Sequence, residues 1–279
     1  MLHISKVERN FTIAFLIFYA LAAVTSILVQ LTDRFVGLSS VMYGFFIIGW
    51  GASIFLRIVH KRIRLDIIAI SVFLFGLFIV RICRYFLFVH SLTIDRYLWY
   101  LYYIPYIMMP MLTLEAASCV GKSERMKTPS AVKVLWVAAL LLVAGVLSND
   151  LHHFLLRFDN MDDYSGTVDY NWLYYIVVIW VFAVTVGAFI LLIKRCRLSQ
   201  CRKFWYIPVI TSAVSAALIL LYYAIGGSPE IGGIKLYYIQ EVYILLFAGM
   251  WEGFIKIGLI PSNTGYSELF ELSHINAFL

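Results

Sequence analysis

The chain has 279 residues, of which 62% are hydrophobic and 14% charged, and its formal net charge is +6. Soluble domains contain about 45–50% apolar and about 25% charged residues, so this composition excludes an ordinary soluble protein. We expect an all-α, polytopic membrane helix bundle whose first partner is the lipid bilayer.

Eight long apolar runs predict eight transmembrane helices, because a helix needs about 20 apolar residues to cross the hydrocarbon. They cover residues 11–31, 36–56, 65–88, 97–120, 133–149, 170–193, 204–225 and 236–258. The runs are continuous, whereas the strands of a membrane barrel alternate. The first run follows Lys6 and Arg9, as in a signal peptide, but it is too long and another run follows almost at once, so we interpret it as a retained helix.

Basic residues are concentrated in alternate connections between the predicted helices. Three connections carry them: Arg57, Lys61, Arg62 and Arg64; Lys122, Arg125, Lys127 and Lys133; Lys194, Arg195, Arg197, Arg202 and Lys203. The segment 150–169 is instead acidic. Basic connections remain in the cytoplasm, which predicts cytoplasmic termini, an outside acidic segment and a multi-pass protein of the inner (plasma) membrane. The positive charge thus follows from topology, and no nucleic-acid partner is expected.

Three charged residues fall within the outer parts of predicted helices. Arg81 and Arg84 share one face of the third helix, and Glu241 lies about five residues inside the outer end of the eighth. Charges at such depth are costly and usually face a cavity or a partner. We therefore treat all three as candidate ligand-binding residues.

The stretch LSNDLHHFLLRFDN (147–160) adds polar chemistry at the outer end of the fifth helix. Its Asp150, His152 and His153 are further candidate ligand-binding residues. We expect one outer polar chamber that binds a small molecule, in which Arg81 or Arg84 is neutralised by Glu241 or Asp150. The alternative is a set of structural ion pairs and side chains that reach the interface.

Two glutamates lie nearer the cytoplasmic side, Glu115 in the fourth predicted helix and Glu252 in the eighth. Glu252 follows Glu241 by eleven residues, about three helical turns, so both lie along one stripe. Lys256 comes four residues later, and an ion pair within the helix is the favoured interpretation of Glu252. The functional alternative is that this polar stripe carries a signal inward.

Aromatic residues gather on the fourth predicted helix, where YLWYLYYIPYIMMP (97–110) places Trp99, Tyr102, Tyr103 and Tyr106 near one face. Most tyrosines of the chain fit an aromatic belt at the membrane interface. The alternative for some of them is a pocket for a flat or amphipathic ligand, and Tyr103 is our candidate residue there.

No motif predicts catalysis or a cofactor. His152 and His153 diverge by about 100° if they lie on a helix, which makes a poor metal chelate. The sequence contains no nucleophile motif, phosphate-binding glycine loop or paired catalytic carboxylates. We expect a protein that is not an enzyme and that holds neither metal nor cofactor.

Three stretches resemble the N-terminal seven-helix sensor region of bacterial membrane histidine kinases: WYLYYIPYIMMP (99–110), LSNDLHHFLLRF (147–158) and GLIPSNTGYSELFELS (258–273). The resemblance implies an input module that precedes cytoplasmic signalling domains, and it implies no particular ligand. The chain departs from the family by having eight predicted helices and no kinase domain. Because Ile275 and Asn276 follow His274 where an acidic residue and Thr-Pro are expected, His274 is not a phosphoacceptor.

We therefore expect a sensor bundle over residues 1–259 and a cytoplasmic connector over 260–279 that leads to an output domain, with a second copy of the chain considered as a further partner. In the connector, Pro261 ends the last helix, and Leu269 and Phe270 lie on one face of an amphipathic segment. The second interpretation is a small-solute transporter or channel, which also places charges near mid-membrane. A membrane enzyme is the third.

Overall fold

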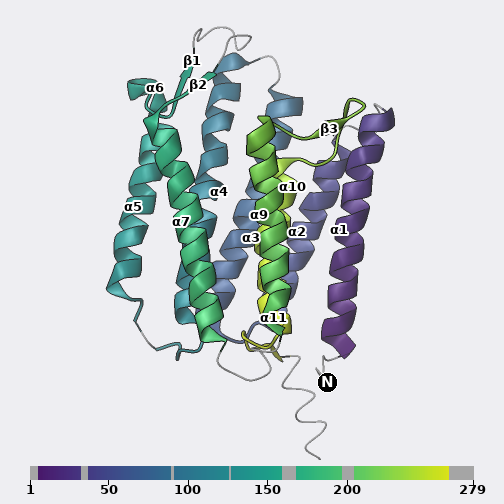
Figure 1. The fold of residues 1–279 in the computed structure, drawn as a ribbon, viewed down its shortest axis with the longest axis vertical. Coiled ribbons are helices and arrows are strands. Elements are labelled where there is room, and N and C mark those ends of the chain that lie inside the picture. Colours follow the sequence, from purple (N-terminus) through teal and green to yellow (C-terminus); the bar gives the residue numbers. More distant parts are fainter. Residues whose placement is uncertain are drawn as a thin grey trace, which may run out of the picture.

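The computed structural model describes residues 6–32, 37–88, 91–125, 127–158, 168–196 and 204–263. It is a bundle of long helices that run up and down along one axis (Figure 1). The long helices are α1 (Lys6–Thr32), α2 (Leu38–Arg57), α3 (Lys61–Ile82), α4 (Leu92–Cys119), α5 (Ser130–Leu147), α7 (Trp172–Arg195) and α9 (Tyr206–Ile225). Each coincides with one of the apolar runs.

The last apolar run forms an interrupted helix of three segments. These are α10 (Ile239–Ile244), the π-helix η2 (Leu245–Gly249) and α11 (Met250–Lys256). A second π-helix, η1 (Cys83–Leu87), extends α3. π-helical segments of this kind are frequent at functional sites.

Short elements close one end of the bundle, which we call the strand end. They are the helix α6 (Asn149–His152) and two antiparallel pairs, β1 (Leu156–Phe158) with β2 (Val168–Tyr170) and β3 (Glu230–Ile231) with β4 (Ile234–Lys235). They lie at the top of Figure 1. His153, which follows α6, has a φ of 55°, and this left-handed conformation turns the chain from the helix into β1.

Six helices in the described residues are long and apolar enough to cross a membrane: α1, α2, α3 with the start of η1, α5, α7 and α9. The chain is a multi-pass membrane protein. The other two predicted spans are helical but less apolar or interrupted: α4 is rich in tyrosine, and the last span contains η2.

The opposite end of the bundle, which we call the basic end, brings together described residues of all three basic connections. The His60 ring lies 3.2 Å from the Lys122 carbonyl, and the Lys61 amide donates to Glu124 at 2.7 Å. Arg195 donates to the Val120 carbonyl at 2.9 Å. The start of α1 and the end of α11 lie at the same end (Figure 1).

The helices pack around two buried cores that share α4. The first core joins α1, α2, α3, α10, η2 and α11, and the second joins α4, α5, α7 and β1. At the basic end, α7 also enters the first core through Ala188 and Leu192. Phe189 of α7 contacts Phe254 of α11 there, with ring centroids 5.9 Å apart. Towards the strand end the two cores separate.

Candidate functional site

Arg84 forms the first polar network near the strand end. Its guanidinium donates to both oxygens of Asp95, at 2.8 and 3.2 Å, and lies 4.6 Å from the centroid of the Trp99 ring. This two-point geometry is the strong form of an arginine–carboxylate pair. Asp95 lies in the first turn of α4, where its charge also suits the helix N-terminus. Arg84 is therefore neutralised by a residue that the sequence analysis did not single out.

A second network connects α4 with α6. Asp150 pairs with Arg96 at 3.0 Å and accepts a hydrogen bond from the Tyr100 hydroxyl at 2.7 Å. Asn149, which is fully buried, donates to Tyr100 at 3.0 Å and to the Leu156 carbonyl at 2.9 Å, and its own carbonyl accepts from the Leu155 amide at 2.8 Å. The Asn149 side chain thus holds the start of β1 close to the end of α5 through hydrogen bonds to the backbone.

The His152 ring faces backbone groups of this same turn, whereas His153 takes part through its backbone carbonyl, and its buried Nδ1 has no partner among the described residues. The Nε2 atom of His152 lies 3.0 Å from the Gly145 carbonyl, and its Nδ1 accepts from the Phe154 amide at 3.0 Å. The carbonyl of His153 accepts from Asn171, which also caps α7. Within the described residues no group of three His, Cys, Asp or Glu side chains is placed to hold a metal ion. The histidines stabilise a turn.

Arg81 and Glu241 lie in a third region, between α3, α10 and α1. Glu241 is buried, accepts from Ser26 at 3.0 Å and forms a capping box with Tyr238 at the start of α10. The Arg81 guanidinium lies 3.7 Å from the centroid of the Tyr238 ring. Arg81 is near enough to act electrostatically on Glu241, although no ion pair joins them among the described residues.

The structure thus corrects the prediction of one polar chamber. The predicted side chains are divided among three networks, and the arginine–carboxylate partners differ from those expected. Arg84 of η1 pairs with Asp95 of α4, and Asp150 of α6 pairs with Arg96 of α4. Asp95 and Arg96 are adjacent in the sequence, and this pair of charges near the outer end of the fourth predicted helix is the signal that indicates partners for Arg84 and Asp150.

A large cavity lies where the two cores separate. Its volume is about 720 Å³, within the range of small-molecule sites, and its walls come from α4, α7, α9 and α10. Tyrosines dominate the wall, so we call it the tyrosine cavity: Tyr85, Tyr102, Tyr103, Tyr106, Tyr170, Tyr174, Tyr222, Tyr223 and Tyr243. Tyr106 and Tyr243 stack on each other in this wall, with centroids 4.7 Å apart.

Two of the seven candidate ligand-binding residues line the tyrosine cavity, Arg84 and Tyr103. The aromatic face predicted on the fourth helix is the α4 wall, with Trp99, Tyr102 and Tyr106 beside Tyr103. Other candidates, such as Asp150, lie in the networks above. The sequence analysis missed the α7 and α9 walls, whose valines, alanines, Thr185 and Ser212 look like ordinary membrane-helix residues.

Near the basic end, Glu252 is held by two side chains of one other helix, α2. Its carboxylate pairs with Arg57 at the end of α2 and accepts from the Trp50 indole at 2.9 Å, and all three side chains are buried. Arg57 also donates to Ser53 at 2.7 Å. The favoured interpretation, a pair between Glu252 and Lys256, is therefore wrong. The partner lies on a helix 195 residues away in sequence.

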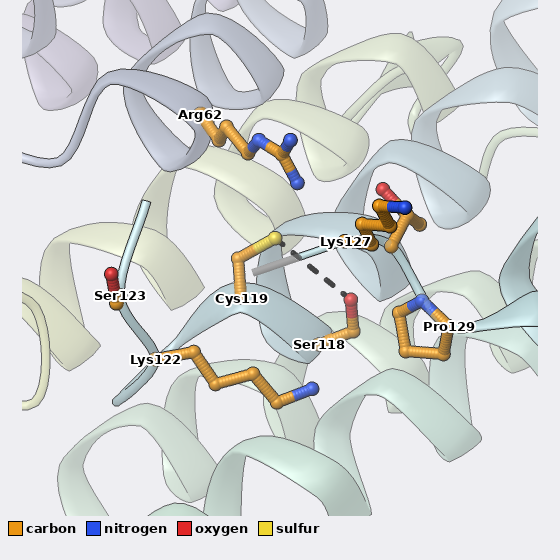
Figure 2. A pocket seen from close by; sticks show the side chains of 8 residues that line it. Arg62, Ser118, Cys119, Lys122, Ser123, Lys127 and Pro129 are labelled. Carbon is orange, nitrogen blue, oxygen red and sulfur yellow. Dashed lines mark hydrogen bonds between the residues drawn. The ribbon is translucent and has the colours of Figure 1, made fainter. Parts of the chain in front are cut away.

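A small basic pocket lies at the same end, beside the last turn of α4. Figure 2 shows Arg62, Lys122 and Lys127 around Ser118 and Cys119. Its volume of about 10 Å³ holds roughly one water molecule. The pocket is too small for an organic ligand, so the tyrosine cavity is the candidate binding site. No family model, curated protein or solved structure matches the chain.

Proposed function

We propose that the chain is a sensory input module that detects a ligand in the tyrosine cavity and relays its presence to a cytoplasmic output domain; it is not an enzyme. One observation carries the proposal: the interrupted helix α10–η2–α11 is at once a wall of the cavity and the last helix of the described residues. Tyr243, Leu246 and Met250 line the cavity, and Glu252 follows Met250 within one turn.

The interrupted helix moves with α9 because the two pack closely. A Cβ atom on Gly249 would lie 2.8 Å from the Thr211 side chain, and one on Gly253 would lie 3.1 Å from the Pro208 Cα. These glycines let the backbones approach, as small residues do between membrane helices. A ligand that displaces α9 therefore acts on η2 and α11 as well.

The segment that follows α11 contacts the end of α2 and the residues just after it. The Val59 amide donates to the Pro261 carbonyl at 3.4 Å, and Asn263 donates to the Leu56 carbonyl at 2.6 Å. Together with the Glu252–Arg57 pair, these contacts form what we call the exit clamp. A switch needs two arrangements that the ligand binds differently, and in this proposal they differ at the clamp.

The proposed orientation follows from the basic end. In this proposal the bundle crosses an inner (plasma) membrane eight times, and the basic connections face the cytoplasm. Both termini then lie in the cytoplasm, and the exit clamp faces the output domain. The resemblance to histidine-kinase sensor regions supports this role. The predicted connector face, with Leu269 and Phe270, falls outside the described residues.

A cavity-filling substitution tests the relay without any ligand. Ala216 lines the cavity from α9, so Ala216→Trp places a large side chain there. In the full chain in lipid nanodiscs, we expect faster hydrogen exchange at the Val59 amide, measured by mass spectrometry, because the displaced α9 loosens the exit clamp. The matched control is Leu140→Trp on the exposed face of α5, which should leave Val59 unchanged.

Unchanged exchange at Val59 in the folded Ala216→Trp protein would contradict the relay. Measuring solute uptake distinguishes a sensor from the competing function, a small-solute transporter or channel. Liposomes that contain the full chain should show no saturable uptake of sugars, amino acids or inorganic ions above empty liposomes. Saturable uptake of any of them would favour the transporter.

A further inference from the structure

Three hydroxyl groups in the wall of the tyrosine cavity are buried without a hydrogen-bond partner. They belong to Tyr102 on α4, Thr185 on α7 and Ser212 on α9, and each residue lines the cavity. In the described part of the chain none of the three oxygens has a partner, and Tyr102 as a residue is 6% exposed. Buried polar groups are normally satisfied. Three exceptions around one cavity indicate a ligand with hydrogen-bonding atoms.

These hydroxyls lie at similar depth. Thr185 is thirteen residues from Trp172, where α7 begins at the strand end, and Ser212 is thirteen residues from Ile225, where α9 ends there. With a helical rise of 1.5 Å per residue, both lie about 20 Å from the strand end, and Tyr102 lies about 15 Å from the start of α4. This depth corresponds to the middle of a bilayer whose hydrocarbon is about 30 Å thick.

The cavity offers no uncompensated charge to a ligand. Arg84 is the one ionised side chain among the described residues that line it, and Asp95 already engages this guanidinium at two points. A charged group buried at this depth without a partner is strongly disfavoured. The ligand that fits is therefore uncharged.

The cavity has an apolar side opening between α7 and α9, besides the exposed Tyr85 and Tyr170 that line it at the strand end. Phe182 of α7 and Leu220 of α9 both line the cavity, yet they are 68% and 67% exposed, so they form its rim. The floor towards the basic end is closed by Phe189, which contacts Phe254. An opening of this kind, on helices that cross the membrane, faces lipid. Access is therefore from the bilayer.

We propose that the tyrosine cavity binds an uncharged lipid-soluble amphiphile, whose oxygen-bearing head contacts Tyr102, Thr185 and Ser212 and whose hydrocarbon chain passes between α7 and α9 into the bilayer. This names the ligand class of the proposed sensor and rests on the same cavity. The hydroxyls select an oxygen-bearing head, and the missing countercharge selects against ions. The lateral opening selects a hydrocarbon body.

Photolabelling of the full chain in phosphatidylcholine nanodiscs tests the proposal. The probe is a long-chain fatty alcohol with a diazirine in its chain, and mass spectrometry locates the adducts. We expect saturable adducts within 177–186 of α7 and 213–220 of α9. Oleyl alcohol should compete, whereas 1-octadecene, which lacks the oxygen, and oleate at pH 9, which is charged, should compete about tenfold less well. Non-saturating adducts on Val134 and Leu141 of α5, both exposed to lipid, are the internal control.

Conservative variants test whether each of the three hydroxyls binds the head of the alcohol. Tyr102→Phe, Thr185→Val and Ser212→Ala should each weaken competition by oleyl alcohol about two- to tenfold, the value of one hydrogen bond. Thr185→Ser keeps a hydroxyl, so oleyl alcohol should compete with the probe for this variant as well as it does for the unchanged chain. Equal competition by all three competitors, or no saturable labelling at all, would overturn the ligand class. So would a photocrosslink from position 182 to a second copy of the chain, which would show that another protomer fills the opening.

The two proposals fail separately. Selective binding of fatty alcohol with unchanged Val59 exchange would retain the ligand and refute the relay. Faster exchange in Ala216→Trp without selective binding would retain the relay and refute this ligand class.

Discussion

The two halves of the interrupted helix α10–η2–α11 are built in opposite ways. Towards the basic end, the Glu252 carboxylate is satisfied by Arg57 and Trp50, and Gly253 packs directly on Pro208 of α9. Towards the strand end, Tyr243 lines a cavity in whose wall three hydroxyls lack partners among the described residues. A single helix therefore joins a tightly packed region to an incompletely packed one.

The difference in packing indicates where a ligand gains contacts and where a displacement is transmitted. Interiors packed to crystal-like density transmit displacements, because they do not deform continuously. The region around the tyrosine cavity lacks that packing, so a ligand has contacts to gain there. If this contrast is correct, substitutions near Glu252 destabilise strongly, and substitutions at the cavity hydroxyls stabilise the empty protein. The predictions below test both sides of the contrast.

The largest effect is expected at the buried ion pair. Glu252→Gln leaves the Arg57 charge buried without its carboxylate and should lower the free energy of unfolding by about 3–5 kcal/mol. Unfolding of the full chain in mixed detergent micelles measures it. The control is Lys256→Ala on the same helix, which should change stability by less than about 0.5 kcal/mol. Similar losses in both variants would mean that the Glu252–Arg57 pair is not the anchor.

The next effect concerns the strand end. Asn149→Ala removes the amide that joins Tyr100 to the backbone of Leu155 and Leu156. It should cost about 2–3 kcal/mol, because buried backbone groups lose their partners. Faster hydrogen exchange at Leu155 and Leu156 is the specific readout. The control is the neighbouring Ser148→Ala, whose half-buried hydroxyl donates to the Ala144 carbonyl and lies 3.2 Å from the His152 ring, away from the Leu155 and Leu156 backbone. A stable Asn149→Ala protein with protected amides would refute this role.

Sequence patterns predicted the helices better than their contacts. A long apolar run predicts a membrane helix because a helix satisfies its own backbone, and each long helix overlaps one of those runs. The partners of Arg84 and Glu252 were not predictable in this way, since each depends on how two helices pack. The aromatic face of α4 was visible from helical spacing. Thr185 and Ser212 were not, because an unpartnered hydroxyl is a property of the folded chain.

A smaller loss is expected where α11 packs on α9. Gly253→Ala places a Cβ atom 3.0 Å from the Pro208 Cβ and 3.1 Å from its Cα, and the Cα belongs to the backbone. Such overpacking costs about 1–3 kcal/mol. The matched control is Gly187→Ala on α7, where a Cβ meets no atom within 4 Å. The difference in unfolding free energy between the two variants measures the contact, and equal stability would show that α9 and α11 are not tightly coupled.

The smallest expected effect has the opposite sign. Thr185→Val replaces a buried hydroxyl that lacks a partner with a methyl group of similar shape, so it should raise the stability of the ligand-free chain by about 1 kcal/mol. The matched control is Thr113→Val on α4, where the hydroxyl donates to the Met109 carbonyl at 2.8 Å in a fully buried position and its loss should be neutral or destabilising. Unfolding is measured first without added lipid and then with oleyl alcohol. The gain at Thr185 should disappear when oleyl alcohol is present, because the hydroxyl then has a partner in the unchanged chain. A Thr185→Val protein that is less stable than the unchanged chain under both conditions would mean that the hydroxyl is already satisfied, and the contrast between the two halves of the helix would fail.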